Sequence, residues 1–375
     1  MTKKRKEWVM GAVVSLAAIL LCLVLGEVVL SFVLPDWGTF RYQADEDIGF
    51  RLEPSEKAMV NEHGFRDYVY SKQKPSHVFR IVGIGDSQTA SCGFTAIPNA
   101  YLKVLEKNLG SLGNAETTYE VLNMGVPNYT PYEYLHMFTK YGVQYDPDLV
   151  LVALYVGNDI QAIPQNKDYI VFDGKLISRQ ALNLADHSEF EIRVWKWFHE
   201  RKLYRILQRA QYANIWQAHD SAGQRGFNRL SIFLKEQSRT PSDQESTRVA
   251  WDDVQTNLLH IRKAVHDIGA RLLVVIIPEE HQINVPLRKT SLQQLKAQAI
   301  DYDFEQWNRK LIEFGAAHDI RILDLTPGLA KAIEHERLYF KNDIHLNERG
   351  HQLMGEFILD FLVEQHMLAT QGKAA

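Results

Sequence analysis

The chain has 375 residues, and its 42 Lys and Arg against 46 Asp and Glu give a formal net charge of −4, which argues against a broadly basic nucleic-acid-binding protein. Hydrophobic residues make up 46% and charged residues 23%, as in ordinary globular proteins, so the composition argues against a disordered or fibrous chain. The two cysteines, Cys22 and Cys92, are too few for a disulfide framework or a multi-cysteine zinc site.

The N-terminal segment combines a basic tip with a long apolar run. Lys3–Lys6 precede Trp8–Gly26, which contains no charged residue, and Glu27 alone interrupts the continuation of the run. A run of this length predicts a single membrane-spanning helix within residues 8–34. Because acidic residues follow it, the positive-inside rule predicts a cytoplasmic N-terminus. Residues 1–35 are thus expected to anchor the chain in the inner (cytoplasmic) membrane of a bacterium, with its bulk periplasmic or extracellular.

Two other interpretations of this segment remain open. A cleaved signal peptide normally has a shorter apolar region that ends in a small-x-small cleavage site, and no clean site follows here. A lipoprotein would carry lipid on Cys22, but the residue before it is Leu21, where a small residue is expected. The uncleaved anchor is therefore the favoured interpretation.

Residues 36–76 are polar and rich in turn formers, and they predict an approach segment to a domain at residues 77–370. Within that domain, short apolar runs alternate with segments of helical periodicity. The expected strands are Val78–Gly83, Tyr119–Leu122, Leu149–Val156, Arg271–Ile277 and Ile320–Leu325, and the expected helices include Pro98–Leu112, Tyr132–Tyr141, Val254–Ile268 and Phe304–His318. This alternation predicts an α/β layered domain with a mostly parallel sheet and a ligand site at the carboxyl ends of its strands.

One stretch, residues 161–247, has weak apolar periodicity, which indicates a partly helical insertion. It holds a basic and aromatic patch between Arg193 and Arg205. This patch fits a helix that packs its aromatic side chains on the domain, and an interfacial membrane helix is the alternative.

The first predicted strand leads into Gly85-Asp86-Ser87. A serine between a parallel strand and a helix can meet a substrate beside backbone N–H groups that bind an oxyanion. Taken alone the tripeptide is weak, because Ser87 could equally be a helix cap. A dinucleotide-binding loop is also weak here, since Gln88 stands where a third glycine is expected.

The ends of the next two strands carry further hydrogen-bond donors. The second strand leads to Gly125 and the third to Asn158. A glycine lets a backbone N–H approach a ligand closely, and an asparagine amide can donate to an oxyanion. Each residue alone also fits an ordinary turn.

Asp343-Ile344-His345 precedes an apolar C-terminal helix. A serine nucleophile needs an imidazole to accept its proton and a carboxylate to orient that imidazole. A short loop can supply both groups. His351, one turn into the helix, fits a packing or capping role better.

Together these blocks resemble the SGNH/GDSL hydrolase superfamily, whose four motifs occur here in order over residues 61–363: Gly85-Asp86-Ser87, Gly125, Gly157-Asn158-Asp159 and Asp343-Ile344-His345. The resemblance implies a flavodoxin-like three-layer α/β/α fold with a parallel five-stranded sheet. Many members place the acid three residues before the histidine, where this chain has Asn342. Members with the shorter spacing also exist, so Asp343 is the favoured acid.

The resemblance also implies the roles of the site residues. Ser87 would be the nucleophile, His345 the general base and Asp343 its orienting acid. The Ser87 N–H, the Gly125 N–H and the Asn158 side chain would form the oxyanion hole. No metal or cofactor is implied.

The expected activity is that of a membrane-anchored serine esterase that hydrolyses an acyl ester, with acetyl favoured, on a glycan or a lipid. The alternative enzyme is an O-acyltransferase that modifies a cell-surface polysaccharide together with a membrane-bound O-acyltransferase partner. A non-catalytic scaffold that binds a glycan or a partner is the remaining alternative. No nucleic-acid partner is expected.

Overall fold

The protein's structure, a computed structural model, describes residues 3–33, 40–91, 95–112, 117–160, 169–172, 174–178, 234, 237–239, 241–341 and 343–368. The predicted patch between residues 193 and 205, most of the predicted insertion, and Asn342 lie outside these residues. The predicted division into regions 1–35, 36–76 and 77–370 stays a prediction.

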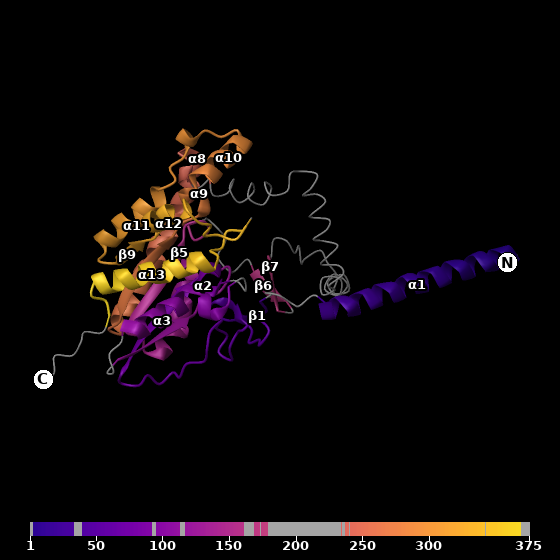
Figure 1. The fold of residues 1–375 in the computed structure, drawn as a ribbon, viewed down its shortest axis with the longest axis horizontal. Helices are drawn as coiled ribbons and strands as arrows, with labels where there is room; N and C mark the ends of the chain where they lie inside the picture. Colours follow the sequence, from indigo (N-terminus) through magenta and orange to yellow (C-terminus); the bar gives the residue numbers. More distant parts are fainter. Residues whose placement is uncertain are drawn as a thin grey trace. The chain divides into compact units, whose positions relative to one another are not determined.

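The N-terminal segment forms one helix, α1 (Lys3–Val33) (Figure 1). Large apolar side chains along it are exposed to solvent, among them Trp8, Leu16 and Val24. In the described part of the chain, no helix has both the length and the hydropathy needed to cross a membrane. The structure therefore does not support the predicted membrane-spanning helix.

A five-stranded parallel sheet forms the centre of the domain that follows, as predicted. Its strand order is β4-β3-β5-β8-β9, the order of a flavodoxin-like sheet. The strands lie within two residues of their predicted bounds: β3 (Val78–Gly85), β4 (Thr118–Asn123), β5 (Leu149–Tyr155), β8 (Arg271–Ile277) and β9 (Arg321–Asp324).

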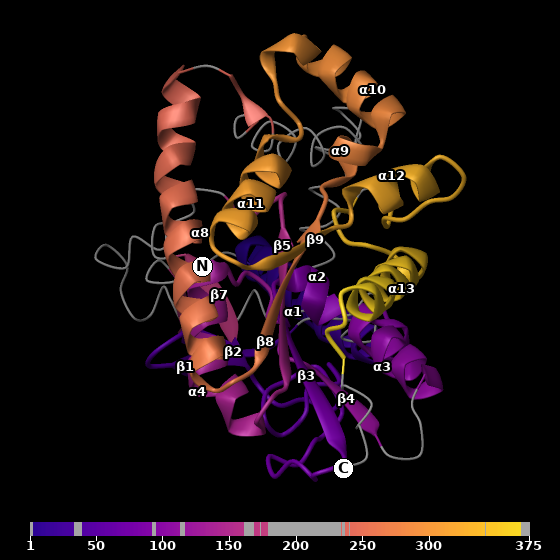
Figure 2. The ribbon, with the colours of Figure 1, turned by 90° about the vertical axis from the view of Figure 1, so that its left-hand side faces the viewer.

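Helices cover both faces of this sheet (Figure 2). Alternate residues of each strand point to opposite faces, so Val150 and Val152 of β5 pack on one side while Leu149 and Leu151 pack on the other. The first face is covered by α4 (Pro131–Lys140), α8 (Pro241–Asp267) and α11 (Gln306–Ala317), and the second by α3 (Tyr101–Leu112), α12 (Thr326–Ile333) and α13 (Glu348–Glu364). Helix α2 (Ser87–Ala90) follows β3, and α9 (Glu280–Ile283) and then α10 (Val285–Leu295) follow β8. Among the described residues, 3-10 turns lie at η2 (Ile97–Asn99), η3 (Gly142–Tyr145) and η5 (Ala299–Asp301).

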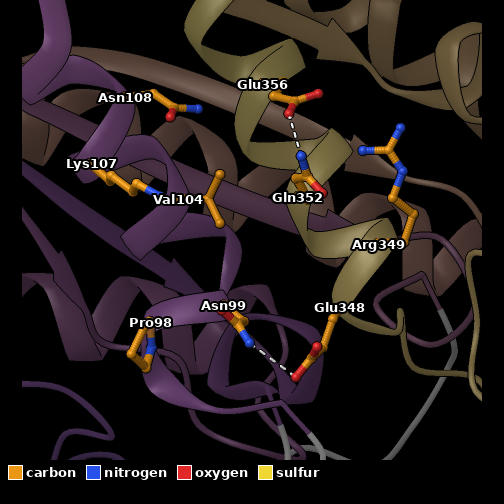
Figure 3. Close-up of a pocket in the computed structure, with 9 residues that line it drawn as sticks. All are labelled: Pro98, Asn99, Val104, Lys107, Asn108, Glu348, Arg349, Gln352 and Glu356. Atoms are coloured by element: carbon orange, nitrogen blue, oxygen red, sulfur yellow. Dashed lines mark hydrogen bonds between the residues drawn. The ribbon is translucent and has the colours of Figure 1, made fainter.

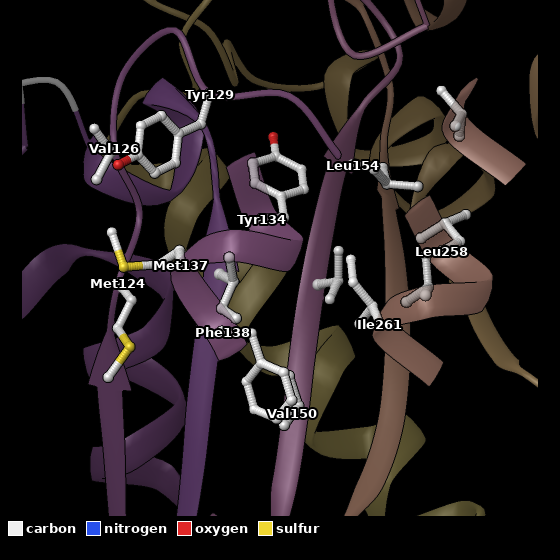
Figure 4. Close-up of a cluster of buried hydrophobic side chains, with 14 of the residues drawn as sticks. Met124, Val126, Tyr129, Tyr134, Met137, Phe138, Val150, Leu154, Leu258 and Ile261 are labelled. Carbon is white, nitrogen blue, oxygen red and sulfur yellow. The ribbon is translucent and has the colours of Figure 1, made fainter. Parts of the chain in front are cut away.

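The core on the first face is built where α4 and α8 pack side by side against the sheet (Figure 4). Phe138 of α4 and Leu258 of α8 are fully buried there together with Leu154 of β5. Apolar side chains at helical spacing, such as Val254, Leu258 and Ile261, produce this buried stripe. Helix α8 is longer than predicted, because it begins at Pro241, inside the predicted insertion.

Residues 40–70, expected to be a polar approach segment, contribute side chains to the same core. Strands β1 (Tyr42–Asp45) and β2 (Gly49–Leu52) pair antiparallel, and Phe50 and Leu52 are 1% and 0% exposed. The Tyr129 hydroxyl donates to the Phe50 carbonyl at 2.6 Å. Isolated apolar residues in a polar stretch produce no periodicity, so the sequence did not indicate this packing. A second hairpin, β6 (Tyr169–Phe172) and β7 (Lys175–Ser178), lies within the predicted insertion.

The α4–α8 core allows a direct test of its contribution to stability. Replacing Leu258 by Ala should lower the free energy of unfolding by about 2–5 kcal/mol, because it removes buried methyl groups and leaves a cavity. Val249→Ala on the same helix is the control, since Val249 is 59% exposed and its replacement should change stability by no more than about 0.5 kcal/mol. Urea unfolding followed by circular dichroism measures both. Equal effects of the two substitutions would contradict the packing.

Candidate active site

Ser87 is the first residue of α2, which Asp86 separates from the end of β3. The Asp86 carboxylate caps this helix by accepting the Gln88 N–H at 2.8 Å. A side chain at Gly85 would place its Cβ 2.0 Å from the Thr89 hydroxyl, so the turn needs glycine for close approach. Ser87 is 8% exposed. The turn therefore holds the serine hydroxyl at the carboxyl edge of the sheet.

His345 reaches Ser87 from the loop before α13. The distance from His345 Nε2 to Ser87 Oγ is 2.9 Å. On its other side, Nδ1 hydrogen-bonds to an oxygen of Asp343, and that same oxygen accepts the His345 backbone N–H at 2.9 Å. Because a carboxylate only accepts, Nδ1 carries the proton and Nε2 is free to accept one from the serine. The structure thus brings the three predicted residues together in one hydrogen-bonded chain.

Gln88 holds this histidine loop against the serine turn. Its side-chain amide donates to the Ile344 carbonyl at 2.8 Å and accepts the Leu346 N–H at 3.1 Å. These two bonds lie on either side of His345, and Gln88 is 1% exposed. In the sequence, Gln88 stands out only as a departure from a dinucleotide-binding loop, because no local pattern shows a contact across 256 residues.

Asn158 is linked to the serine through Asp86. Its Nδ2 donates to Asp86 Oδ2 at 3.0 Å, and the same carboxylate oxygen lies 3.5 Å from Ser87 Oγ. The amide carries a second N–H in addition to this bond, and its Oδ1 is buried with no partner in the described residues. The structure therefore places Asn158 beside the nucleophile, where an oxyanion donor is expected.

Gly125 lies two residues after β4, and its part in an oxyanion hole stays a prediction. In this structure its N–H donates to the Asn123 side-chain oxygen at 2.9 Å. A Cβ at this position would lie 2.5 Å from the Ala90 nitrogen. The glycine is thus required for close packing against α2. Asn123 also donates to the Thr89 carbonyl at 2.8 Å, which ties the end of β4 to the serine helix.

Two buried carboxyl groups lie behind Asn158. Burial raises the pKa of Asp86, and burial together with the nearby Asp86 raises the pKa of Asp159 well above its ordinary value. The Tyr134 hydroxyl donates to both oxygens of Asp159 at 2.9 and 3.0 Å. Burial and the like charge of Asp86 therefore both oppose ionisation of Asp159.

The sequence matches the GDSL-like lipase/acylhydrolase family over residues 84–353, a span that holds all of the residues just described. The chain belongs to this family. Its members hydrolyse esters, so the GDSL protein described here is an enzyme that acts on ester bonds.

Solved structures with partial similarity to the chain were also found, whereas no curated protein matched the sequence. TesA is 14% identical with a TM-score of 0.40, covering 77% of this chain and 99% of its own. A catalytic mutant of Axe2, an acetylxylan esterase from Geobacillus stearothermophilus, is 14% identical with a TM-score of 0.41, covering 79% and 97%. A lipase/acylhydrolase from Enterococcus faecalis is 14% identical with a TM-score of 0.39, covering 78% and 100%.

His351 of the GDSL domain packs behind the site. It is 1% exposed, and its ring stacks on Tyr101 with centroids 6.1 Å apart. Burial lowers the pKa of His351 to about 3. The ring is therefore neutral at physiological pH and serves packing, in line with its sequence-based interpretation.

A pocket of about 500 Å³ lies between α3 and α13 of the GDSL domain (Figure 3). Its walls carry both signs of charge, from Lys107 and Arg349 on one hand and Glu348 and Glu356 on the other. None of the residues that line it belongs to the serine–histidine–carboxylate chain. Among the described residues, no group of three His, Cys, Asp or Glu side chains is placed to hold a metal ion.

The Gln88 contacts predict a measurable effect on turnover. Replacing Gln88 by Met keeps the volume and removes both hydrogen bonds, each worth about 1 kcal/mol when buried. His345 should then be held less firmly against Ser87, and kcat on an aryl ester should fall about tenfold or more. The control is Gln352→Met, because Gln352 is exposed and its side chain donates to Glu356 on the same helix, away from the triad. Unchanged kcat in a folded Gln88→Met protein would show that the loop is positioned by other contacts.

Proposed function

We propose that this GDSL enzyme hydrolyses acyl esters by a Ser87–His345–Asp343 triad. The observation that carries the proposal is the 2.9 Å contact between Ser87 Oγ and His345 Nε2, with Asp343 on the opposite ring nitrogen. Ser87 Oγ attacks the ester carbonyl carbon while His345 Nε2 takes its proton. The tetrahedral intermediate then expels the alcohol, which receives that proton from His345. Water, activated by the same imidazole, releases the acid and restores Ser87.

The oxyanion of that intermediate needs donors next to Ser87. The second N–H of the Asn158 amide and the backbone N–H of Ser87 at the start of α2 are the groups we assign to it. The predicted third donor, the Gly125 N–H, joins them only if it releases the Asn123 oxygen. Removing one such donor typically costs about 10²–10³ in kcat.

We further propose that the acyl group is small, with acetyl favoured, and the low exposure of Ser87, 8%, is in keeping with a narrow approach to its hydroxyl. The alcohol portion of the ester is then a glycan or a lipid. Transfer of the acyl group to a sugar hydroxyl, together with a membrane-bound O-acyltransferase partner, uses the same acyl-Ser87 intermediate. Only the final acceptor differs between hydrolysis and transfer.

Labelling with a fluorophosphonate probe tests the triad. Peptide mapping of the wild type should find the Ser87 peptide labelled rapidly and Ser111, an exposed serine of α3, unlabelled. Ser87→Ala should abolish the Ser87 adduct, and Asp343→Asn should slow it by about 10²-fold or more, because the imidazole loses its orienting charge. Equal labelling of wild type and Asp343→Asn would remove Asp343 from the mechanism. Product analysis with an acetylated oligosaccharide separates hydrolysis, which releases acetate, from transfer, which yields a newly acetylated acceptor.

We further propose that the N-terminal segment holds the enzyme at the inner membrane, with the GDSL domain on the outer side. Support comes from the basic residues Lys3–Lys6 before the uncharged Trp8–Gly26 and from the exposed apolar side chains of α1. The full chain should stay in the membrane pellet after carbonate extraction, whereas a chain lacking residues 1–35 should be soluble. Added protease should reach the domain in spheroplasts. Complete extraction of the full chain by carbonate would refute the anchor.

A further inference from the structure

A second carboxylate–histidine pair follows β8, two residues apart like Asp343 and His345. The Glu279 carboxylate accepts the His281 backbone N–H at 2.5 Å. It also lies 2.9 Å from His281 Nδ1. This is the hydrogen-bond pattern of the Asp343–His345 pair. In both pairs, the carboxylate fixes the proton on Nδ1 and leaves Nε2 as the acceptor.

A serine occupies the remaining nitrogen of this ring as well. His281 Nε2 lies 3.2 Å from Ser291 Oγ, which α10 supplies. The three side chains therefore repeat the order of hydroxyl, imidazole and carboxylate found at Ser87. Such an arrangement lowers the cost of removing the serine proton, which is the basis of nucleophile activation.

The acid and base of this trio are more buried than its serine, the reverse of the Ser87 site, where the serine is buried and His345 and Asp343 are half-buried. Glu279 and His281 are 6% and 7% exposed, and Ser291 is half-buried. The His281 imidazole is thus shielded from water, whereas the Ser291 hydroxyl is accessible to water. Helix capping explains why Glu279 is fixed, because it caps α9 in a capping box with Gln282. Capping does not explain the contact between His281 Nε2 and Ser291.

The charges around His281 set the pH range in which it can act as a base. Burial would lower the pKa of His281, but Glu279 and Glu280 outweigh burial and Arg288, and the pKa lies above its ordinary value. The imidazole is therefore deprotonated, and able to accept the serine proton, only on the alkaline side of that raised pKa. Reactivity of Ser291 should accordingly increase with pH.

We propose that Ser291 is a second reactive serine, which accepts acyl groups from activated esters. Ser291 Oγ forms a bond to the acyl carbon while His281 Nε2 takes the hydroxyl proton. The bond to the leaving alcohol breaks, and the alcohol takes that proton, so the products are O-acyl-Ser291 and free alcohol. Ser291 lies inside a helix, where its own N–H belongs to the helical hydrogen bonds and does not serve an oxyanion. Acylation of Ser291 is therefore slow, and hydrolysis of the acyl-serine is slow as well, so the acyl group stays on Ser291. Ser291 is thus a site of covalent modification. The inference does not rest on the proposed function of Ser87.

The test uses the full chain carrying Ser87→Ala, which removes the first nucleophile. The protein is incubated with p-nitrophenyl acetate at mildly alkaline pH, and acetylated serines are quantified by peptide mass mapping. Ser291 should acetylate at least about tenfold faster than Ser111, an exposed helical serine, because it has a general base. The rate at Ser291 should rise with pH and level off once His281 is deprotonated, whereas the unassisted rate at Ser111 should keep rising with hydroxide concentration.

Two further substitutions in the Ser87→Ala background separate chemistry from folding. His281→Asn retains a donor toward Glu279 but has no Nε2, and Glu279→Gln retains the helix cap but loses the charge. Both should reduce acetylation of Ser291 at least several-fold while near-UV circular dichroism stays native. The proposal is overturned if Ser291 is acetylated at the rate of Ser111. It is also overturned if the acetylation rate of Ser291 is unchanged in a folded His281→Asn or Glu279→Gln protein. Failure of the fluorophosphonate probe to label Ser87 in the wild type would, in contrast, count against the Ser87 triad and not against Ser291.

Discussion

Helices cover both faces of the parallel sheet. Polar side chains can therefore reach a substrate only at the ends of the strands. All eight residues of β3 and all seven of β5 are buried, as expected for central strands covered on both sides. Because the strands run parallel, their carboxyl ends share one edge. Ser87 follows β3, Asn158 follows β5 and Glu279 follows β8. The chemistry of the enzyme is confined to this edge by the burial of everything below it.

That edge still needs a histidine, which comes from a loop 258 residues away in sequence. The loop is held at three points. Gln88 binds the backbone on both sides of His345, the Tyr339 hydroxyl donates to the Pro278 carbonyl at 2.7 Å, and the Phe340 N–H donates to the His345 carbonyl at 3.0 Å. Each bond is worth about 1 kcal/mol, and together they fix the distance between base and nucleophile, on which catalysis depends most strongly.

Segment 40–70 supports the site from behind. Asp67 accepts the Asn123 N–H at 2.7 Å and pairs with the buried Lys103 at 2.9 Å. Asn123 in turn binds Thr89 and Gly125. Through this chain of buried bonds, a segment that contributes none of the triad residues positions the turn that carries Ser87. Because a buried polar group left without its partner is costly, removal of the Asp67 or Asn123 side chain should shift the position of Ser87.

Local pattern was enough to predict the five strands, their parallel arrangement and the blocks that carry Ser87, Asp343 and His345, because strand burial and short-range turn chemistry are written in adjacent residues. The likeness of four motifs to a known family added the roles of those three residues. Only the tertiary structure decided that the Gly125 N–H binds Asn123, that Gln88 clamps the histidine loop and that His281 meets Ser291. These contacts join side chains from separate elements, and no periodicity along the chain records which distant groups packing brings within hydrogen-bond distance.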